Sequence, residues 1–326
     1  MGPLVLDIEG TALTKDDVRR IADPLVGMVI LFTRNYRDRE QLTELCAAIH
    51  AVKPGLLIAV DHEGGRVQRF QEGFTKIPAM AKLGEKWIDE PENTLLAAMA
   101  CGYVMAAELR ACGVDFTFAP CLDINFGRSQ IIGERAFSNN PNVVTQLALA
   151  VVQGLRLAGM SNCGKHFPGH GWVIADSHLE LPVDDRPYER LLFADLKPYR
   201  WMGQALDSVM AAHVLYPQVD SNPAGFSEHW LKKVLREELH FTGVVFSDDL
   251  SMKGAVGVGD VTQRAQTALQ AGCDMLIQCN DFEASDQLLG SLKFEDTAER
   301  AERVKRLCPK GDAPTWKELV KTALYK

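Results

Sequence analysis

The sequence lacks the features that mark several classes of protein. Its opening, MGPLVLDIEG, has an apolar run of about four residues with no basic stretch before it, so neither a secretory signal nor a membrane-spanning segment is indicated. We therefore expect a cytoplasmic protein with no membrane partner. Lysine and arginine number 35 against 43 acidic residues, a net charge of −8. This balance argues against a nucleic-acid partner, because such binding depends on clustered basic residues.

Cysteine pairs with the spacing of metal or redox sites are also missing. No CxxC occurs among the eight cysteines, most of which lie within apolar segments: Cys46, Cys101, Cys112, Cys121, Cys163, Cys273, Cys279 and Cys308. We expect buried, reduced thiols rather than disulfides or a metal site, and no bound cofactor. Hydrophobic residues make up 47% of the chain, which is enough for a sizeable core.

Short runs rich in Val, Ile, Leu and Phe alternate with amphipathic segments of helical periodicity. The runs cover residues 3–8, 27–33, 55–61, 115–121, 162–167, 207–214, 243–249 and 273–279. A strand followed by a helix, eight times, predicts an α/β fold of the (β/α)8 TIM-barrel type. A doubly wound open sheet is the alternative, but no GxGxxG follows an early strand.

The barrel interpretation predicts where the site lies and how the chain is divided. We expect one catalytic domain over residues 1–326, monomeric, with the last 35 or so residues as a helical extension packed on the barrel. In this fold the active site lies at the carboxyl ends of the strands. Polar residues gather at these ends: Asp61, Asp123, Lys165, His166, His213, Asp248 and Asp249.

Two motifs have both a functional and a structural interpretation. In DHEGGRVQRF, Asp61 could accept hydrogen bonds from hydroxyl groups or cap a turn, with Arg69 on the surface. In IIGERAF, Arg135 lies between apolar neighbours, and a buried arginine needs partners. It could bind a substrate, or it could hold a structural carboxylate such as Glu134 or Asp123.

The stretch GVVFSDDLSM brings two adjacent carboxylates to the end of a fully apolar strand. Neighbouring residues on a strand point in different directions, so one of the two can face the barrel axis. We expect the chemistry from Asp248 and a turn cap from Asp249.

The stretch KHFPGHGWVIADSH holds three histidines in a loop broken by proline and glycine. Asp176 and His178 are two residues apart, so the carboxylate can orient the imidazole and stabilise its protonated form. A histidine with a pKa near 6.5 is a natural proton donor and acceptor at cellular pH.

Histidines and aspartates at several strand ends also fit a metal-dependent hydrolase. The candidate ligands would be His166, His170, His178, His213 and Asp248. Against this alternative, no HxH pair leaves the first strand, and Lys165 and Arg135 suit anions or hydroxyl groups better than a cation.

The motif KHFPGHG followed by DSH, with DHEGGRVQRF upstream and FSDDLSM downstream, resembles the single-domain β-N-acetylglucosaminidases of family 3 glycoside hydrolases. The resemblance covers about residues 1–310. It implies a TIM barrel that removes terminal β-linked N-acetylglucosamine with retention, from cytoplasmic muropeptides during bacterial cell-wall recycling. The implied substrate is N-acetylglucosaminyl-1,6-anhydro-N-acetylmuramic acid, with or without its peptide, and no cofactor is implied.

The resemblance also implies roles for individual residues. The family's nucleophilic aspartate matches Asp248, and its acid/base dyad matches Asp176 and His178. We expect the loop that carries this dyad to swing and bring His178 to the bond after the sugar binds. The family's sugar-binding residues match Asp61, Arg69, Arg135, Lys165 and His166.

Some positions depart from the family's pattern. Trp172 and Val173 stand where an Asp-Thr pair is common, His62 replaces a usual glutamine, and Glu134 replaces a usual aspartate. The indole of Trp172 could stack on a sugar or hold the loop to the barrel. Two further activities remain as alternatives: a phosphorylase that uses phosphate in place of water, and a sugar-binding barrel without turnover.

Overall fold

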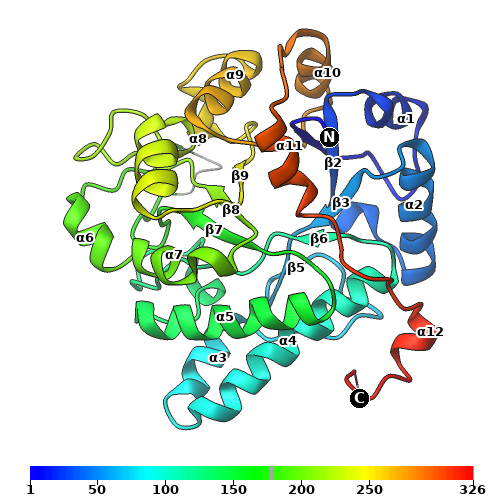
Figure 1. Cartoon of the computed structure of the whole chain (residues 1–326), viewed down its shortest axis with the longest axis horizontal. Coiled ribbons are helices and arrows are strands. Elements are labelled where there is room, and N and C mark those ends of the chain that lie inside the picture. Colours follow the sequence, from blue (N-terminus) through cyan, green and yellow to red (C-terminus); the bar gives the residue numbers. More distant parts are fainter. Residues whose placement is uncertain (176–179, 326) are drawn as a thin grey trace.

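Eight parallel strands of the described residues form a closed barrel, as the sequence predicts (Figure 1). The computed structural model describes residues 1–175 and 180–325. The strands are β1 (Leu4–Leu6), β2 (Val26–Leu31), β3 (Leu57–Val60), β6 (Phe116–Thr117), β7 (Cys163–Phe167), β8 (Ser208–Ala211), β9 (Val244–Ser247) and β10 (Leu276–Gln278). Hydrogen bonds give the orders β10-β1-β2-β3-β6 and β7-β8-β9. Parallel bridges from Cys121 to Lys165 and from Phe246 to Met275 join the two sheets into a ring.

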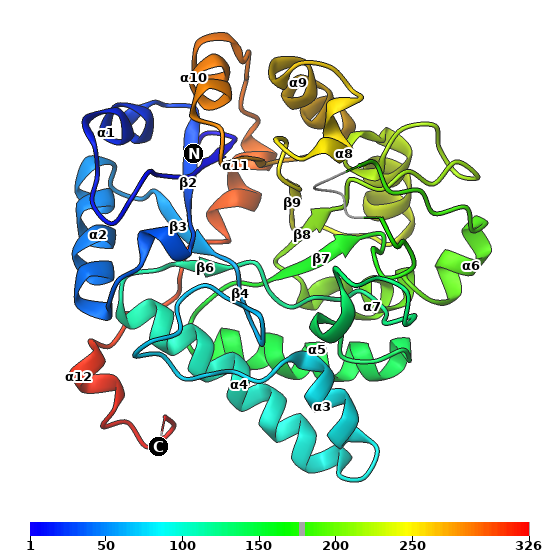
Figure 2. The same ribbon diagram turned by 180° about the vertical axis from the view of Figure 1, so that it is seen from behind.

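Helices surround this ring, and Figure 2 shows them from the opposite side. The α-helices are α1 (Lys15–Ala22), α2 (Arg39–Val52), α3 (Met80–Trp87), α4 (Pro91–Ala111), α5 (Pro141–Leu157), α6 (Tyr188–Phe193), α7 (Leu196–Met202), α8 (Lys253–Val256), α9 (Val261–Ala271), α10 (Phe282–Ser291), α11 (Ala298–Lys305) and α12 (Trp316–Leu319). Short 3-10 turns are η1 (Thr33–Asn35), η2 (Gly133–Arg135), η3 (Gly203–Ala205) and η4 (Ala224–Phe226), and η5 (His229–Glu238) is π-helical.

Local sequence explains why these elements form where they do. Every residue of β2 is buried, as expected for a parallel strand that is covered on both faces. Helix α1 begins with a capping box, in which the side chains of Thr14 and Asp17 each accept from the other's backbone N–H. Helix α9 begins in the same way with Asp260 and Gln263.

The barrel interior is a packed core rather than a channel. Large side chains from facing strands meet in it, with Phe116, Phe118 and Phe246 in mutual contact at centroid distances of 5.2 to 5.8 Å. Val304 in α11 and Leu307 just after it belong to the same buried cluster. Figure 1 shows α11 lying across this end of the barrel, so the interior is closed there and a ligand site is left to the other end.

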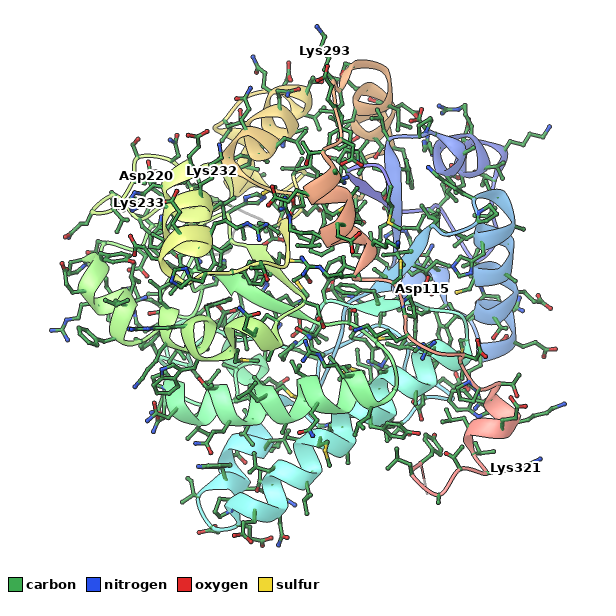
Figure 3. All side chains as sticks on the ribbon, in the orientation of Figure 1. Asp115, Asp220, Lys232, Lys233, Lys293 and Lys321 are labelled. Carbon is green, nitrogen blue, oxygen red and sulfur yellow. The ribbon has the colours of Figure 1, made fainter. Side chains whose placement is uncertain are left out.

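The outer surface carries the charged side chains. Figure 3 shows Lys233, Lys293 and Lys321 projecting away from the molecule. All eight cysteines are free, and the six that are buried lie in apolar surroundings, as expected for cysteines in apolar segments. Near the C-terminus, the ring of Trp316 in α12 packs on Phe74 at 5.6 Å.

Helices α4 and α5 approach closely because glycines face each other between them. A Cβ atom on Gly102 would lie 2.2 Å from the carbonyl oxygen of Val151, and one on Gly154 would lie 2.0 Å from that of Met99. Helix α4 is long and apolar enough to cross a membrane by length and composition, but half of its most apolar window is buried inside the protein. Its packing against α5 is that of a core helix.

We expect Gly154→Ala to destabilise the protein by about 1–3 kcal/mol, because the added methyl group collides with backbone atoms that cannot rotate away. The gain in helix propensity from alanine, up to about 1 kcal/mol, is smaller. The matched control is Gly290→Ala in α10, where a Cβ meets nothing within 4 Å, so that only the propensity gain remains. Urea unfolding of both variants tests this prediction, which a stabilising Gly154→Ala would contradict.

Candidate active site

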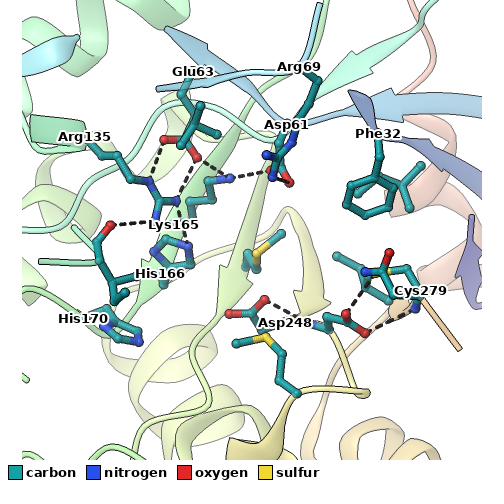
Figure 4. Close-up of a pocket in the computed structure, with 18 of the residues that line it drawn as sticks. Phe32, Asp61, Glu63, Arg69, Arg135, Lys165, His166, His170, Asp248 and Cys279 are labelled. Carbon is teal, nitrogen blue, oxygen red and sulfur yellow. Dashed lines mark hydrogen bonds and ion pairs between the residues drawn. The ribbon is translucent and has the colours of Figure 1, made fainter. Parts of the chain in front are cut away.

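A cavity of about 600 Å³ opens at the carboxyl ends of the strands, as the barrel interpretation predicts (Figure 4). Its lining includes every candidate site residue of the described chain: Asp61, Arg69, Arg135, Lys165, His166 and Asp248. These residues come from four separate segments, after β3, in η2, at the end of β7 and after β9. The fold therefore brings together the side chains that the motifs singled out.

The DHEGGRVQRF motif forms an antiparallel hairpin rather than a simple turn. Its two short strands are β4 (His62–Gly64) and β5 (Val67–Gln68). Gly64 has a φ of 99°, and a Cβ there would lie 2.6 Å from the carbonyl oxygen of Pro78, so the hairpin requires glycine. The hairpin places Glu63 and Arg69 beside the cavity together with Asp61.

Asp61 lies between two cations. Its Oδ1 is 2.8 Å from Nζ of Lys165, and its Oδ2 is 3.4 Å from Nη2 of Arg69. Burial would raise the pKa of Asp61, but the two positive charges outweigh it and hold this pKa below its usual range. Asp61 is therefore an ionised hydrogen-bond acceptor at the cavity wall.

Glu63 is the site residue that the sequence motifs did not identify. Its Oε1 is 2.6 Å from Nζ of Lys165, and both of its oxygens are 2.9 Å from nitrogens of Arg135 (Figure 4). The expectation that Arg135 might hold Glu134 or Asp123 is wrong, because its carboxylate partner is Glu63. A carboxylate two residues after Asp61 could have been noticed, since side chains two apart on a strand share a face.

The cluster of Glu63, Lys165 and Arg135 is almost completely shielded from solvent. Glu63 exposes 1% of its side chain, Lys165 3% and Arg135 11%. Burial disfavours each charge, yet the opposite charges win: the pKa of Glu63 lies far below its usual range and that of Lys165 above it. All three groups are therefore charged at neutral pH.

His166 is held through both of its ring nitrogens. Its Nδ1 lies 2.7 Å from Oδ2 of Asp123, and its Nε2 lies 3.4 Å from Nη2 of Arg135. Arginine only donates, so Nε2 accepts and Nδ1 carries the proton that it donates to Asp123. Burial would raise the pKa of Asp123, but its interactions with His166 and His170 keep this pKa well below its usual range.

Asp248 faces this charged cluster from the other side of the cavity (Figure 4). It follows the buried strand β9, and its backbone N–H donates to the carbonyl of Ala211 in β8. The side chain of its neighbour Asp249, which also borders the cavity, accepts from the backbone and hydroxyl of Ser251 and from the thiol of Cys279. Asp249 therefore caps the turn, as expected, and leaves Asp248 at the cavity.

The first part of the histidine-rich loop is tied to the barrel. The backbone N–H of His170 donates to Oδ1 of Asp123 at 2.7 Å, and the hydroxyl of Tyr216 donates to the carbonyl of Gly169. Val173 is buried, whereas Ile174 is 65% exposed. The chain is thus held as far as residue 173.

Trp172 supports this anchoring rather than facing the cavity. The guanidinium carbons of Arg128 and Arg186 lie 4.1 and 4.7 Å from its ring centroid, and Phe126 meets it edge-on at 5.3 Å. Of the two roles expected for this indole, holding the loop to the barrel agrees with these contacts. Asp176 and His178, the proposed acid/base dyad, lie outside the described residues.

Of the candidate ligands of the metal-hydrolase alternative, His178 lies outside the described residues, and the other four do not form a metal-binding group among the described residues. Three ligand atoms do come within 4.8 Å of one another, but they belong to Cys121, Asp123 and His166. Asp123 already accepts from the thiol of Cys121 at 3.3 Å and from the ring of His166. These hydrogen bonds explain why Cys121, Asp123 and His166 lie together: Asp123, which also accepts from Cys121, holds the ring of His166.

His62 is buried against Phe70 and Phe74, at centroid distances of 6.0 and 5.9 Å. Burial, helped by the charge of Arg69, lowers the pKa of His62 to about 3. Between pH 6.5 and 3 the unfolded chain therefore takes up a proton that the folded protein does not. The contribution of His62 to the free energy of unfolding therefore decreases as the pH falls through this window, by about 1.4 kcal/mol per pH unit.

We expect His62→Gln to reduce the loss of unfolding free energy between pH 7 and pH 5, measured by urea titration. His50→Gln is a control of opposite sign, because the hydrogen bond that its ring donates to Asp115 raises the pKa of His50. The ion pair of His50 with Asp115 stabilises the fold at low pH and weakens as the pH rises. Removing it should therefore increase the loss of unfolding free energy between pH 7 and pH 5. An equal dependence of unfolding free energy on pH in both variants and the parent would contradict the lowered pKa of His62 and the raised pKa of His50.

Comparisons with known proteins agree with this geometry. Residues 5–307 match the family model described as the glycosyl hydrolase family 3 N terminal domain. A β-hexosaminidase of Bordetella parapertussis is 54% identical over 328 residues, which cover 100% of this chain and 93% of that protein. The crystal structure of native NagZ from Neisseria gonorrhoeae superposes with a TM-score of 0.94 at 46% identity, over 99% of this chain and 94% of that one. The same enzyme in complex with N-trifluoroacetyl-D-glucosamine matches equally well. The chain therefore belongs to glycoside hydrolase family 3, and within that family it is a β-hexosaminidase.

Proposed function

We propose that this β-hexosaminidase is a retaining exo-enzyme that releases terminal, non-reducing N-acetylglucosamine from muropeptides. The proposed substrate is N-acetylglucosaminyl-1,6-anhydro-N-acetylmuramic acid, with or without its peptide, in the bacterial cytoplasm during cell-wall recycling. One observation carries the proposal: a single cavity holds Asp248 on one side and a cluster of fixed, charged hydrogen-bonding groups on the other. No cofactor takes part in the proposed reaction.

The charged side suits the hydroxyl groups of a terminal sugar. An ionised Asp61 accepts hydrogen bonds, and the ammonium group of Lys165 and the guanidinium group of Arg69 donate them. Arg135 contributes less directly, since four of its five N–H groups already meet Glu63, His166 and the carbonyl of Ile131. A wall of fixed charged groups on one side of the cavity supports binding of a terminal sugar.

The first step follows from the position of Asp248. With the sugar held by the charged cluster, a carboxylate oxygen of Asp248 attacks the anomeric carbon. The bond to the leaving oxygen breaks, and protonated His178 donates its proton to that oxygen. The result is a glycosyl ester on Asp248 and a free alcohol.

In the second step a water molecule hydrolyses this ester. His178, now neutral, accepts a proton from the water while the water oxygen attacks the anomeric carbon. The carboxylate of Asp248 leaves, the product is N-acetylglucosamine with its original β-configuration, and His178 is protonated again. Asp176 orients the imidazole and stabilises its charged form between the steps.

The relatives support the sugar specificity. Each of the curated relatives compared is named a β-hexosaminidase, and the Neisseria gonorrhoeae structure holds an N-acylated glucosamine. The muropeptide and the cytoplasmic location are supported by the likeness of the three motifs to the single-domain family members.

The proposal is tested by incubating the purified protein with 4-nitrophenyl N-acetyl-β-glucosaminide and with the anhydro-disaccharide, both in the presence of a chelator. We expect nitrophenolate release from the first and free N-acetylglucosamine from the second. Proton NMR of the nascent sugar should show the β-anomer first. Sugar 1-phosphate formed in phosphate buffer would point to a phosphorylase instead, and activity that disappears with the chelator and returns with zinc would overturn the metal-independent mechanism.

A further inference from the structure

Two charged groups of the sugar site, those of Lys165 and Arg135, are held from one side by a residue that does not itself need to meet the sugar. Glu63 comes from β4, whereas Lys165 lies within β7 and Arg135 ends η2. Its Oε1 lies within 2.9 Å of both cations, and its Oε2 lies 2.9 Å from Nε of Arg135. Glu63 therefore joins three segments of the barrel that are otherwise far apart in the sequence.

We propose that Glu63 is a positioning residue of the sugar site, which fixes Lys165 and Arg135 by ion pairs and, through Arg135, sets the tautomer of His166. The bidentate contact leaves Arg135 one orientation, and in it Nη2 donates to Nε2 of His166. This donation leaves the proton of His166 on Nδ1, facing Asp123. The inference rests on the proposed sugar site, since it assigns how that site is kept in order.

The charge balance around Lys165 gives Glu63 a second effect. The ammonium group faces Asp61 at the end of β3, Glu63 in β4 and the cation of Arg135 in η2. Without the charge of Glu63, Lys165 keeps one carboxylate and one neighbouring cation. Its pKa then falls, and it loses its proton in an alkaline range where the parent protein keeps it.

The test is the variant Glu63→Gln, whose amide has the same size but places an NH2 group against donors. We expect kcat/KM for the aryl glucosaminide to fall by about 100-fold, because small misplacements of binding groups have effects of this order. We also expect the ratio of kcat/KM of the variant to that of the parent to decline between pH 8 and 10, because only the variant loses the proton of Lys165 in that range. A purely structural role would not move the pH profile.

The matched control is Glu108→Gln, in an equally buried glutamate of α4 that accepts from the backbone and hydroxyl of Thr75, away from the cavity. It should lose stability but keep kcat/KM within about 3-fold of the parent. Equal losses of kcat/KM in the two variants, or a Glu63→Gln variant with parental kinetics and pH profile, would overturn the proposal.

A second variant covers the case in which Glu63→Gln does not fold. Glu63→Asp keeps the charge, but its shorter side chain cannot reach Lys165 and both nitrogens of Arg135 together. A loss of kcat/KM of about 10-fold or more, with an unchanged alkaline profile, is expected, and parental kcat/KM would overturn the proposal. Turnover by the parent in the same assay separates the two questions, because an inactive parent would contradict the proposed function and not the role of Glu63.

Discussion

Replacing Asp248 with alanine is expected to lower kcat for 4-nitrophenyl N-acetyl-β-glucosaminide by about 10⁴-fold or more, with little change in thermal stability. The carboxylate is proposed to form the covalent bond, and among the described residues the neighbouring carboxylate of the cavity wall, that of Asp249, is not expected to replace it. Asp249 cannot do so because its oxygens are occupied by Ser251 and Cys279. Steady-state kinetics of the variant and the parent measure the loss.

Chemical rescue distinguishes a nucleophile from a residue that only shapes the site. In Asp248→Ala, a small anion such as azide fits the space of the missing carboxylate and attacks the anomeric carbon from the same face. We expect azide to restore turnover with an aryl substrate and to form the α-glycosyl azide. Asp249→Asn serves as the neighbouring control and should show no rescue. Rescue of Asp249→Asn by azide, together with an active Asp248→Ala, would contradict the assignment of Asp248 as the nucleophile.

Replacing His178 with alanine is expected to lower kcat for the anhydro-disaccharide by about 10²–10⁴-fold, the usual contribution of a general acid or base. A sugar alkoxide is a poor leaving group and needs the proton in the first step. A dinitrophenolate leaves without it, so kcat/KM for 2,4-dinitrophenyl N-acetyl-β-glucosaminide should stay within about 10-fold of the parent. The slope of activity against leaving-group pKa measures this difference.

Asp176→Asn is the companion variant, since it keeps the shape of the dyad and removes its charge. Its acid limb in the pH profile of kcat should move to lower pH, because an imidazolium ion without its carboxylate loses the proton more readily. An equal loss in His178→Ala for good and poor leaving groups would argue that His178 binds substrate instead of transferring protons.

Much of the fold could be read from one-dimensional patterns. All eight predicted strands overlap the observed ones, because buried parallel strands are continuous apolar runs and the helices between them have their own period. The sequence indicates a turn at residues 62–68, where the structure has a hairpin, because strands of two or three residues are too short to show an alternating pattern. The segment from His229 to Glu238 has a helical pattern, but the pattern does not tell an α-helix from the π-helix that forms.

The candidate site was found for a similar reason. Asp61 and Asp248 directly follow buried strands, and Lys165 lies in the carboxyl-terminal part of another, so the barrel alone brings them to one rim. The sequence suggests Glu134 or Asp123 as a carboxylate partner of Arg135 because both are near it in the chain, whereas the observed partner, Glu63, is 72 residues away. Periodicity carries no information about which side chains meet across the barrel.

The sequence by itself determined the barrel, the rim on which the polar residues gather and, through its three motifs, the family. These follow from patterns that are local along the chain: strand and helix periods, glycine and proline positions, and short motifs. Only the tertiary structure decided that Glu63 holds Lys165 and Arg135, that Trp172 lies against Arg128 and Arg186, and that α11 closes the far end of the barrel. Such contacts depend on the directions of side chains from distant segments, which packing in three dimensions sets and no local pattern contains.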